Sequence, residues 1–116
     1  MDAPLEVKNH RSDCCEVIEL DGELDVATAP DLAAVLDAMA LNPDHLIIDV
    51  SRLRFMDSTG LRLLVRASTL VEGRIWLEGC SRQVLRLLEL TGIEDLFCLE
   101  DDREMAHRII SESRAS

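Results

Sequence analysis

Short apolar runs and helically spaced apolar positions follow one another along most of the chain. The runs predict five strands, at Leu5 to Asn9, Cys14 to Leu20, His45 to Val50, Arg74 to Glu78 and Phe97 to Leu99. The polar stretch His10 to Asp13 predicts a hairpin turn between the first two. The unbroken run Leu46-Ile47-Ile48 is typical of a central strand covered on both faces.

Apolar positions at helical spacing separate the later strands. They predict helices from about Thr28 to Met39, Ser58 to Val71, Ser81 to Leu90 and from Asp101-Asp102 onward, where Met105, Ile109 and Ile110 would face inward. Thr28 and Ser81 are suitable caps, and Gly92 suits the end of the third helix. Gly22 is expected to break the second strand, and Ser51 to Asp57 is expected to be a loop.

The predicted order is β-β-α-β-α-β-α-β-α. This order indicates an α/β fold: a mixed sheet with an initial antiparallel hairpin, then mostly parallel strands, and about four helices packed against it. The length of 116 residues fits one domain, with a core from about residue 5 to 110 and short tails.

Charge and composition argue against several classes of function. The formal net charge of −11 repels nucleic acid and anionic membranes, and 3% aromatic residues leave no stacking platform for single strands. No apolar run approaches the ~20 residues that cross a bilayer. The four cysteines form no C-x-x-C pair, so reduced thiols in a cytoplasmic protein are expected.

The segment Met56-Asp57-Ser58-Thr59-Gly60-Leu61 is the most informative one for chemistry. It lies where a buried strand leads into a helix, the edge at which α/β sheets place their sites. Helix capping alone explains Asp57, Ser58 and Thr59, but Gly60 is costly in a first turn unless another surface approaches the backbone closely. Free N–H groups at a helix start would tolerate a phosphate on Ser58, and Arg62, four residues on, is spaced to pair with it.

Other chemistries have little support. His10, His45 and His107 are scattered, which argues against a metal site, and no Gly-rich phosphate loop with a lysine is present, so no cofactor is expected. Ser58 has no histidine in a triad pattern, so an enzyme using Asp57 or Ser58 as catalyst is disfavoured.

Gly22-Glu23-Leu24-Asp25 with Thr28-Ala29 is, by itself, explained by a turn followed by a cap. Together with Ile47-Ile48-Asp49-Val50-Ser51, the segment around Ser58 and Leu90-Thr91-Gly92-Ile93-Glu94-Asp95-Leu96-Phe97, it strongly resembles the STAS family over about residues 15 to 110. Within that family the likeness is to bacterial anti-sigma factor antagonists.

The resemblance implies a phosphorylation switch. Ser58 would be phosphorylated by an anti-sigma factor that is also a serine kinase, the unphosphorylated chain would bind that kinase and free its sigma factor, and a phosphatase would reset it. Asp25, Asp57, Thr59 and Gly60 would form the partner surface with Ser58. Many relatives carry a small residue where this chain has Arg62, which we assign to the same surface.

The resemblance to the STAS family is also compatible with a second function. STAS domains serve as subunits of lipid-transport complexes and in signalling scaffolds, where the same loop would make a constitutive contact. In either case a monomer or weak dimer is expected.

Overall fold

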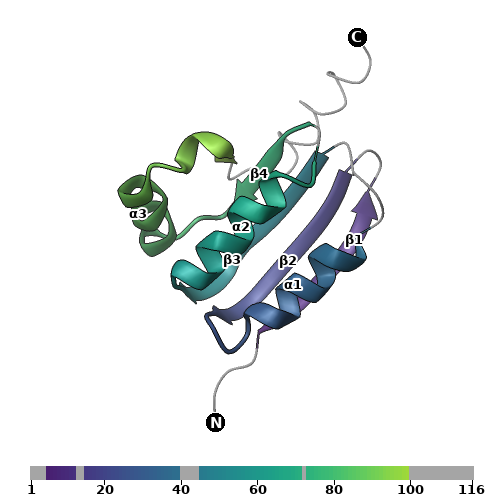
Figure 1. Cartoon of the computed structure of the whole chain (residues 1–116), viewed down its shortest axis with the longest axis horizontal. Helices are drawn as coiled ribbons and strands as arrows, with labels where there is room; N and C mark the ends of the chain where they lie inside the picture. The colour runs from purple at the N-terminus through teal and green to yellow at the C-terminus, as the bar shows by residue number, and fades with distance from the viewer. Residues whose placement is uncertain (1–4, 13–14, 40–44, 72, 100–116) are drawn as a thin grey trace.

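A computed structural model describes residues 5–12, 15–39, 45–71 and 73–99 (Figure 1). The strands are β1 (Glu6–Ser12), β2 (Cys15–Leu24), β3 (His45–Met56), β4 (Ile75–Glu78) and β5 (Cys98–Leu99). The α-helices are α1 (Ala29–Ala38), α2 (Ser58–Ser68) and α3 (Arg82–Thr91), and a 3₁₀ turn, η1, spans Glu94–Leu96.

The strands form one sheet in the order β1-β2-β3-β4-β5. β1 pairs antiparallel with β2, and the remaining pairs are parallel. This confirms the predicted mixed sheet. Three α-helices are described rather than four, because the predicted last helix lies outside the described residues.

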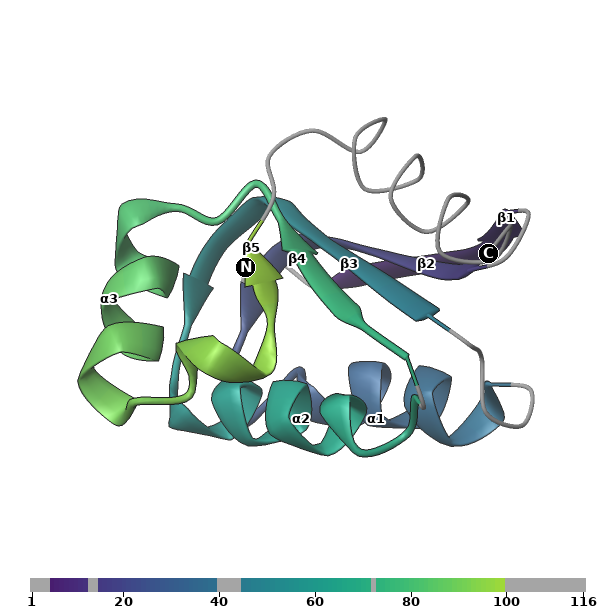
Figure 2. The same cartoon turned by 90° about the horizontal axis from the view of Figure 1, so that it is seen from above.

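The main core lies between the sheet and the helices. Helices α1 and α2 lie side by side against one face of the sheet, and α3 lies beyond one end of it (Figure 2). The inward side chains of β2, β3 and β4 meet the apolar stripe of each helix here. Fully buried examples are Ile18, Leu20, Ile48, Leu77, Leu32, Leu64 and Leu88.

A smaller apolar cluster lies on the opposite face of the sheet. It contains Cys15, Val17, Ile47 and Trp76, with Cys98 packed against it. Because strand residues alternate between faces, Leu46 and Ile48 enter the main core while Ile47 enters this cluster. The prediction that this run is covered on both faces is confirmed.

The predicted hairpin turn is placed too early. His10, Arg11 and Ser12 belong to β1 and pair with Val17, Glu16 and Cys15. The antiparallel pairing therefore extends to Ser12 and Cys15, and residues 13 and 14 lie outside the described part. Polar side chains on an edge strand resemble a turn in sequence, because only one side of such a strand is packed.

Both central strands are longer than predicted. β2 continues through Gly22 to Leu24, and β3 continues through the expected loop to Met56. The two extensions pair with each other, Gly22 with Leu53 and Leu24 with Met56, across register shifts that bend the ladder. A segment expected to be a loop becomes a strand here because its neighbour supplies the hydrogen bonds.

The helix ends follow local chemistry with one exception. The Ser81 hydroxyl accepts from the Val84 N–H, and Gly92 is left-handed at φ 73°, as predicted. Thr28 occupies the N-cap of α1 but makes no side-chain cap bond. In the described part of the chain, no helix is long and apolar enough to span a membrane.

Candidate functional site

The carboxyl ends of β2 and β3 meet at one edge of the sheet. Leu24 pairs with Met56, and the Asp57 N–H donates to the Leu24 carbonyl at 3.2 Å. The two aspartates that follow these paired residues, Asp25 and Asp57, are therefore brought together. We call the outward surface formed by residues 25–28 and 57–59 the switch edge.

Asp57 is the N-cap of α2. One of its oxygens, Oδ1, accepts from the N–H groups of Thr59 at 2.9 Å and Gly60 at 3.2 Å. Ser58 is the first residue of the helix and is exposed, and its hydroxyl has no hydrogen bond to any residue in the described ranges. The capping is thus done by Asp57, and the Ser58 oxygen is left to solvent.

Asp25 organises the turn that leads into α1. Its Oδ1 accepts from the N–H groups of Ala27 at 3.0 Å and Thr28 at 3.1 Å. The Thr28 hydroxyl donates to the Glu23 carbonyl at 2.7 Å and accepts from the Asp25 N–H at 3.0 Å. The Thr28 side chain therefore ties down the turn that precedes α1 instead of capping the helix.

Gly60 is buried and lies against the ends of both strands. A Cβ on this residue would come within 2.7 Å of Leu24 Cγ and 2.8 Å of Met56 Cγ. Such distances are essentially never seen, so only glycine lets α2 begin this close to the sheet. The surface that approaches the Gly60 backbone is the chain's own core, which explains the glycine without a partner.

Gln83 of α3 is a supporting residue that sequence reasoning missed. Its Nε2 donates to the Met56 carbonyl at 2.8 Å, and its Oε1 accepts from the Met56 N–H at 3.3 Å. The side-chain amide thus takes the place of a neighbouring strand at the end of β3. A single polar residue in a helix carries no sequence signal for this contact.

Two shallow apolar grooves flank α2. The groove between α1 and α2 is lined by Val26, Ala29, Pro30, Ala33, Thr59, Arg62, Leu63 and Arg66. The groove between α2 and the end of α3 is lined by Ser58, Leu61, Arg62, Val65, Thr91 and Ile93. Ser58 and Thr59 therefore face different grooves, and Arg62 lines both.

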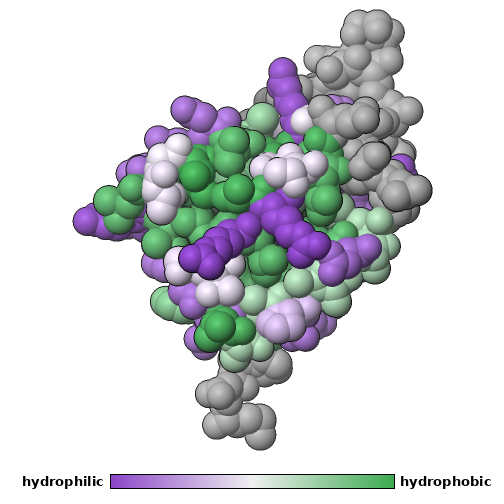
Figure 3. Space-filling model, in the orientation of Figure 1, coloured by the Kyte–Doolittle hydropathy of each residue, from purple (hydrophilic) through white to green (hydrophobic). Residues whose placement is uncertain are grey.

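Figure 3 views this helix face, where hydrophobic residues are widespread and strongly hydrophilic side chains cross the middle. Val26, which sequence reasoning did not single out, is 73% exposed within the switch edge. In the sequence, the one indication of such a role for Val26 was its apolar side chain between Asp25 and Thr28. An exposed apolar side chain beside two apolar grooves is typical of a protein-docking surface.

The two arginines of α2 differ in their partners. Arg66 forms an ion pair with Asp37 of α1, so its charge is balanced locally. Arg62 is exposed and has no ion pair or hydrogen bond with any residue in the described ranges. Of the predicted site residues, Arg62 is therefore the one that brings an unbalanced positive charge to this face.

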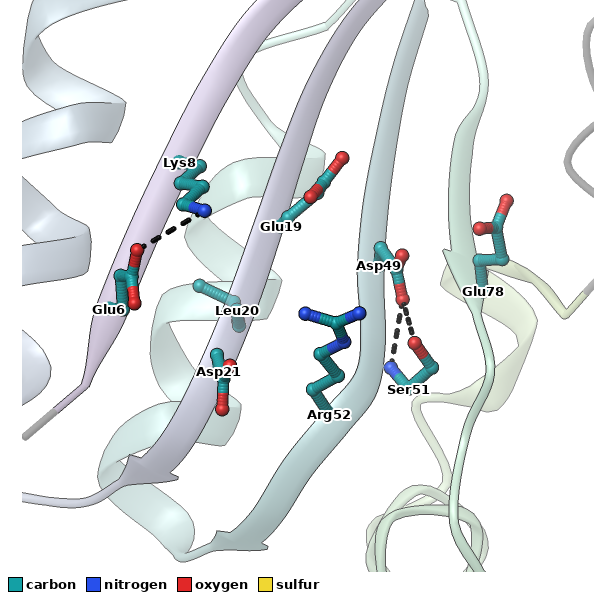
Figure 4. A pocket seen from close by; sticks show the side chains of 9 residues that line it. All are labelled: Glu6, Lys8, Glu19, Leu20, Asp21, Asp49, Ser51, Arg52 and Glu78. Atoms are coloured by element: carbon teal, nitrogen blue, oxygen red, sulfur yellow. Dashed lines mark hydrogen bonds and ion pairs between the residues drawn. The ribbon is translucent and has the colours of Figure 1, made fainter. Parts of the chain in front are cut away.

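The opposite face of the sheet carries a polar hollow of about 310 Å³ (Figure 4). Leu20 and Ser51 line it together with five carboxylates and two cations. The carboxylates are those of Glu6, Glu19, Asp21, Asp49 and Glu78, and the cations are Lys8 and Arg52. Several are engaged locally, since Lys8 pairs with Glu6 at 3.3 Å and Asp49 accepts from the Ser51 hydroxyl at 2.6 Å. The excess of carboxylates disfavours anions, and none of the predicted site residues lies here.

Metal-binding and cysteine chemistry give no further site within the described ranges. No group of three or more His, Cys, Asp or Glu side chains is arranged to hold a metal ion there. Of the described cysteines, Cys15 is buried in the smaller apolar cluster and Cys98 packs against it. His45 accepts from the Arg74 N–H at 3.0 Å and packs edge-on against Trp76.

Comparison with known proteins places this geometry in a family. Residues 7–100 match the family model described as "Mlab, STAS domain". The chain is 33% identical over 92 residues to the anti-sigma-B factor antagonist of Staphylococcus epidermidis, a match that covers 76% of this chain and 85% of the relative.

Two solved structures of anti-sigma factor antagonists have the same fold as this chain. An anti-sigma factor antagonist from Mycobacterium paratuberculosis superposes with a TM-score of 0.84 at 27% identity, covering 96% of this chain and 99% of that one. The anti-sigma factor antagonist SpoIIAA in its unphosphorylated form superposes with a TM-score of 0.70 at 26% identity, covering 97% of each. With the family model matching most of its length, this chain belongs to the STAS domain family.

Proposed function

We propose that the chain is an anti-sigma factor antagonist, a binding regulator rather than an enzyme. Its partner is an anti-sigma factor that is also a serine kinase, and phosphorylation of Ser58 controls the contact. The observation that carries this proposal is that Ser58 is exposed, lines an apolar groove and makes no hydrogen bond with any described residue. The names of the relatives, which describe antagonism of a factor rather than a reaction, support it.

In the unphosphorylated state, the partner covers the switch edge and the flanking grooves, with Val26 as an apolar anchor. Docking buries apolar area and removes water from around Ser58. Asp25 and Asp57 contribute by holding the two turns in shape, since their carboxylates already bind backbone N–H groups. The bound partner releases its sigma factor.

Phosphorylation of Ser58 weakens binding to the partner. The kinase transfers the γ-phosphoryl group of ATP to the Ser58 oxygen, ADP leaves, and the hydroxyl proton is lost. The phosphate adds about −1.5 to −2 charge at the groove rim. A tenfold loss of affinity needs only about 1.4 kcal/mol, and an uncompensated buried charge costs more than that. A phosphatase removes the group and restores binding.

The test is incubation with serine kinases of the anti-sigma type from the same genome, with ATP, followed by mass mapping of the phosphate. We expect modification at Ser58 and none in Ser58→Ala. In a binding titration, Ser58→Asp should bind the kinase at least tenfold more weakly than Ser58→Ala, because only Asp places a charge at the rim. Equal affinities, or a phosphate mapped elsewhere, would contradict the proposal.

A second function keeps the same surface and removes the switch. The matching family model bears the name Mlab, so it does not single out anti-sigma antagonists. A STAS subunit of a lipid-transport complex or a signalling scaffold would use the grooves for a constitutive contact. In that case no kinase would modify Ser58, and Ser58→Ala would leave complex formation unchanged.

A further inference from the structure

Arg62 lies one helical turn after Ser58. Residues four apart on a helix face the same side, and both side chains line the groove between α2 and the end of α3. The rest of that lining is Leu61, Val65, Thr91 and Ile93. The Thr91 hydroxyl is already used, since it donates to the Leu87 carbonyl at 2.7 Å. Arg62 is therefore the charged group of this groove.

The carboxylates near Ser58 would repel a phosphate there, in opposition to the favourable positive end of α2. Asp57 directly precedes Ser58, and Asp25 follows the strand residue paired with Met56. A phosphate would thus lie close to two carboxylates. Arg66, the next cation along α2, is held by Asp37. Of the two arginines of α2, Arg62 is therefore the one without an ion pair to any described residue.

We propose that Arg62 is the phosphate-binding residue of the phosphorylated chain. Its guanidinium donates to the phosphate oxygens on Ser58 across one turn of α2, and the pair lies over the groove between α2 and α3. This inference rests on the proposed function and deepens its regulation. Phosphorylation then both adds negative charge and draws the Arg62 side chain across an apolar surface that the partner would otherwise contact.

Arginine suits this role because its planar guanidinium can give two parallel hydrogen bonds to a phosphate. A carboxylate on the partner would satisfy the same guanidinium in the complex. The intramolecular phosphate is the better-supported anion, because Ser58 and Arg62 share one groove at a fixed helical spacing.

The experiment installs phosphoserine at position 58 during translation, so that no kinase is needed. The second ionisation of the phosphate, with a pKa near about 6, is then followed by ³¹P NMR against pH. An adjacent guanidinium favours the dianion and lowers this pKa. We expect the pKa in Arg62→Gln to be higher than in the unsubstituted phosphoprotein by roughly 0.5.

Two further variants separate pairing from general charge. Arg62→Lys keeps the charge but not the paired donors, so it should restore part of the shift. Arg66→Gln removes an equal charge that Asp37 already balances, so its curve should match the unsubstituted phosphoprotein. Far-UV circular dichroism confirms that each variant is folded.

Superimposable titration curves for Arg62→Gln and the unsubstituted phosphoprotein would overturn the inference. If the curves coincide and Arg62→Glu weakens kinase binding, Arg62 serves a partner carboxylate instead. This titration is independent of the kinase. Failure of any kinase to modify Ser58 would count against the proposed function and leave the pairing result standing.

Discussion

The two turns that follow β2 and β3 use the same chemistry to different ends. Each opens with an aspartate whose Oδ1 accepts two backbone N–H groups, Asp25 in one turn and Asp57 in the other. Each also holds a hydroxyl residue close to the start of its helix. The Thr28 hydroxyl is bonded on both sides, whereas the Ser58 hydroxyl has no partner within the described ranges.

The difference comes from spacing. Thr28 comes three residues after Asp25, so the chain has turned enough for its hydroxyl to reach back to the Glu23 carbonyl. Ser58 directly follows Asp57, and Asp57 has already taken the capping N–H groups. Two hydroxyl residues in similar sequence positions therefore differ in role. Thr28 stabilises its turn through hydrogen bonds, whereas the Ser58 hydroxyl remains available.

The largest expected effect concerns the contact that holds the two turns together. Gly60→Ala would push a methyl group into Leu24 and Met56 at the strand ends. Overpacking of a filled site typically costs about 1–3 kcal/mol, so the free energy of unfolding should fall by that amount. Urea denaturation measures it through the transition midpoint.

A midpoint for Gly60→Ala equal to that of the unsubstituted chain would mean that α2 begins further from the strands than described. Ser58→Ala, an exposed change in the same helical turn, is the matched control. It should stay within about 0.5 kcal/mol of the unsubstituted chain.

The second prediction contrasts the two hydroxyls directly. Thr28→Val keeps the side-chain shape but removes a donor to the Glu23 carbonyl and an acceptor for the Asp25 N–H. Loss of these bonds in a half-buried turn should cost about 1–2 kcal/mol. Thermal and urea unfolding of Thr28→Val beside Ser58→Ala measures the contrast. Equal stabilities for these two variants would erase the distinction between the turns.

The smallest effect concerns the cap of α2. Asp57→Ala removes the acceptor for the Thr59 and Gly60 N–H groups and should cost about 1 kcal/mol. Asp57→Asn retains an acceptor oxygen and should lose less. If Asp57→Asn were as unstable as Asp57→Ala in urea, the carboxylate charge rather than the hydrogen bonds would be holding the helix start.

The candidate site was predicted from sequence in part. The exposed Ser58 at the first residue of α2 and the capping by Asp57 follow from neighbouring residues, which is what local patterns record. The reason for a glycine at position 60 was predicted only in part. A close approach was expected, but the sequence has no way to show that Leu24, 36 positions earlier, is what approaches.

The strand ends show the same limit. Ser51 to Met56 mixes polar and apolar residues and was expected to be a loop, and Gly22 resembles a break, yet each segment is a strand because the other lies beside it. Strand formation depends on a hydrogen-bonding neighbour, which is a property of the pair and not of either segment.

By itself, the sequence determined the order of the five strands and the three described helices, the mixed sheet, the candidate segment around Ser58 and the family likeness, since these depend on hydrophobic periodicity and short-range chemistry. The tertiary structure alone decided which strands extend, what Gly60 packs against, how Gln83 supports β3 and where apolar grooves flank Arg62. The physical reason is that these features arise from contacts between segments distant in the chain, and such contacts exist only once the segments have packed.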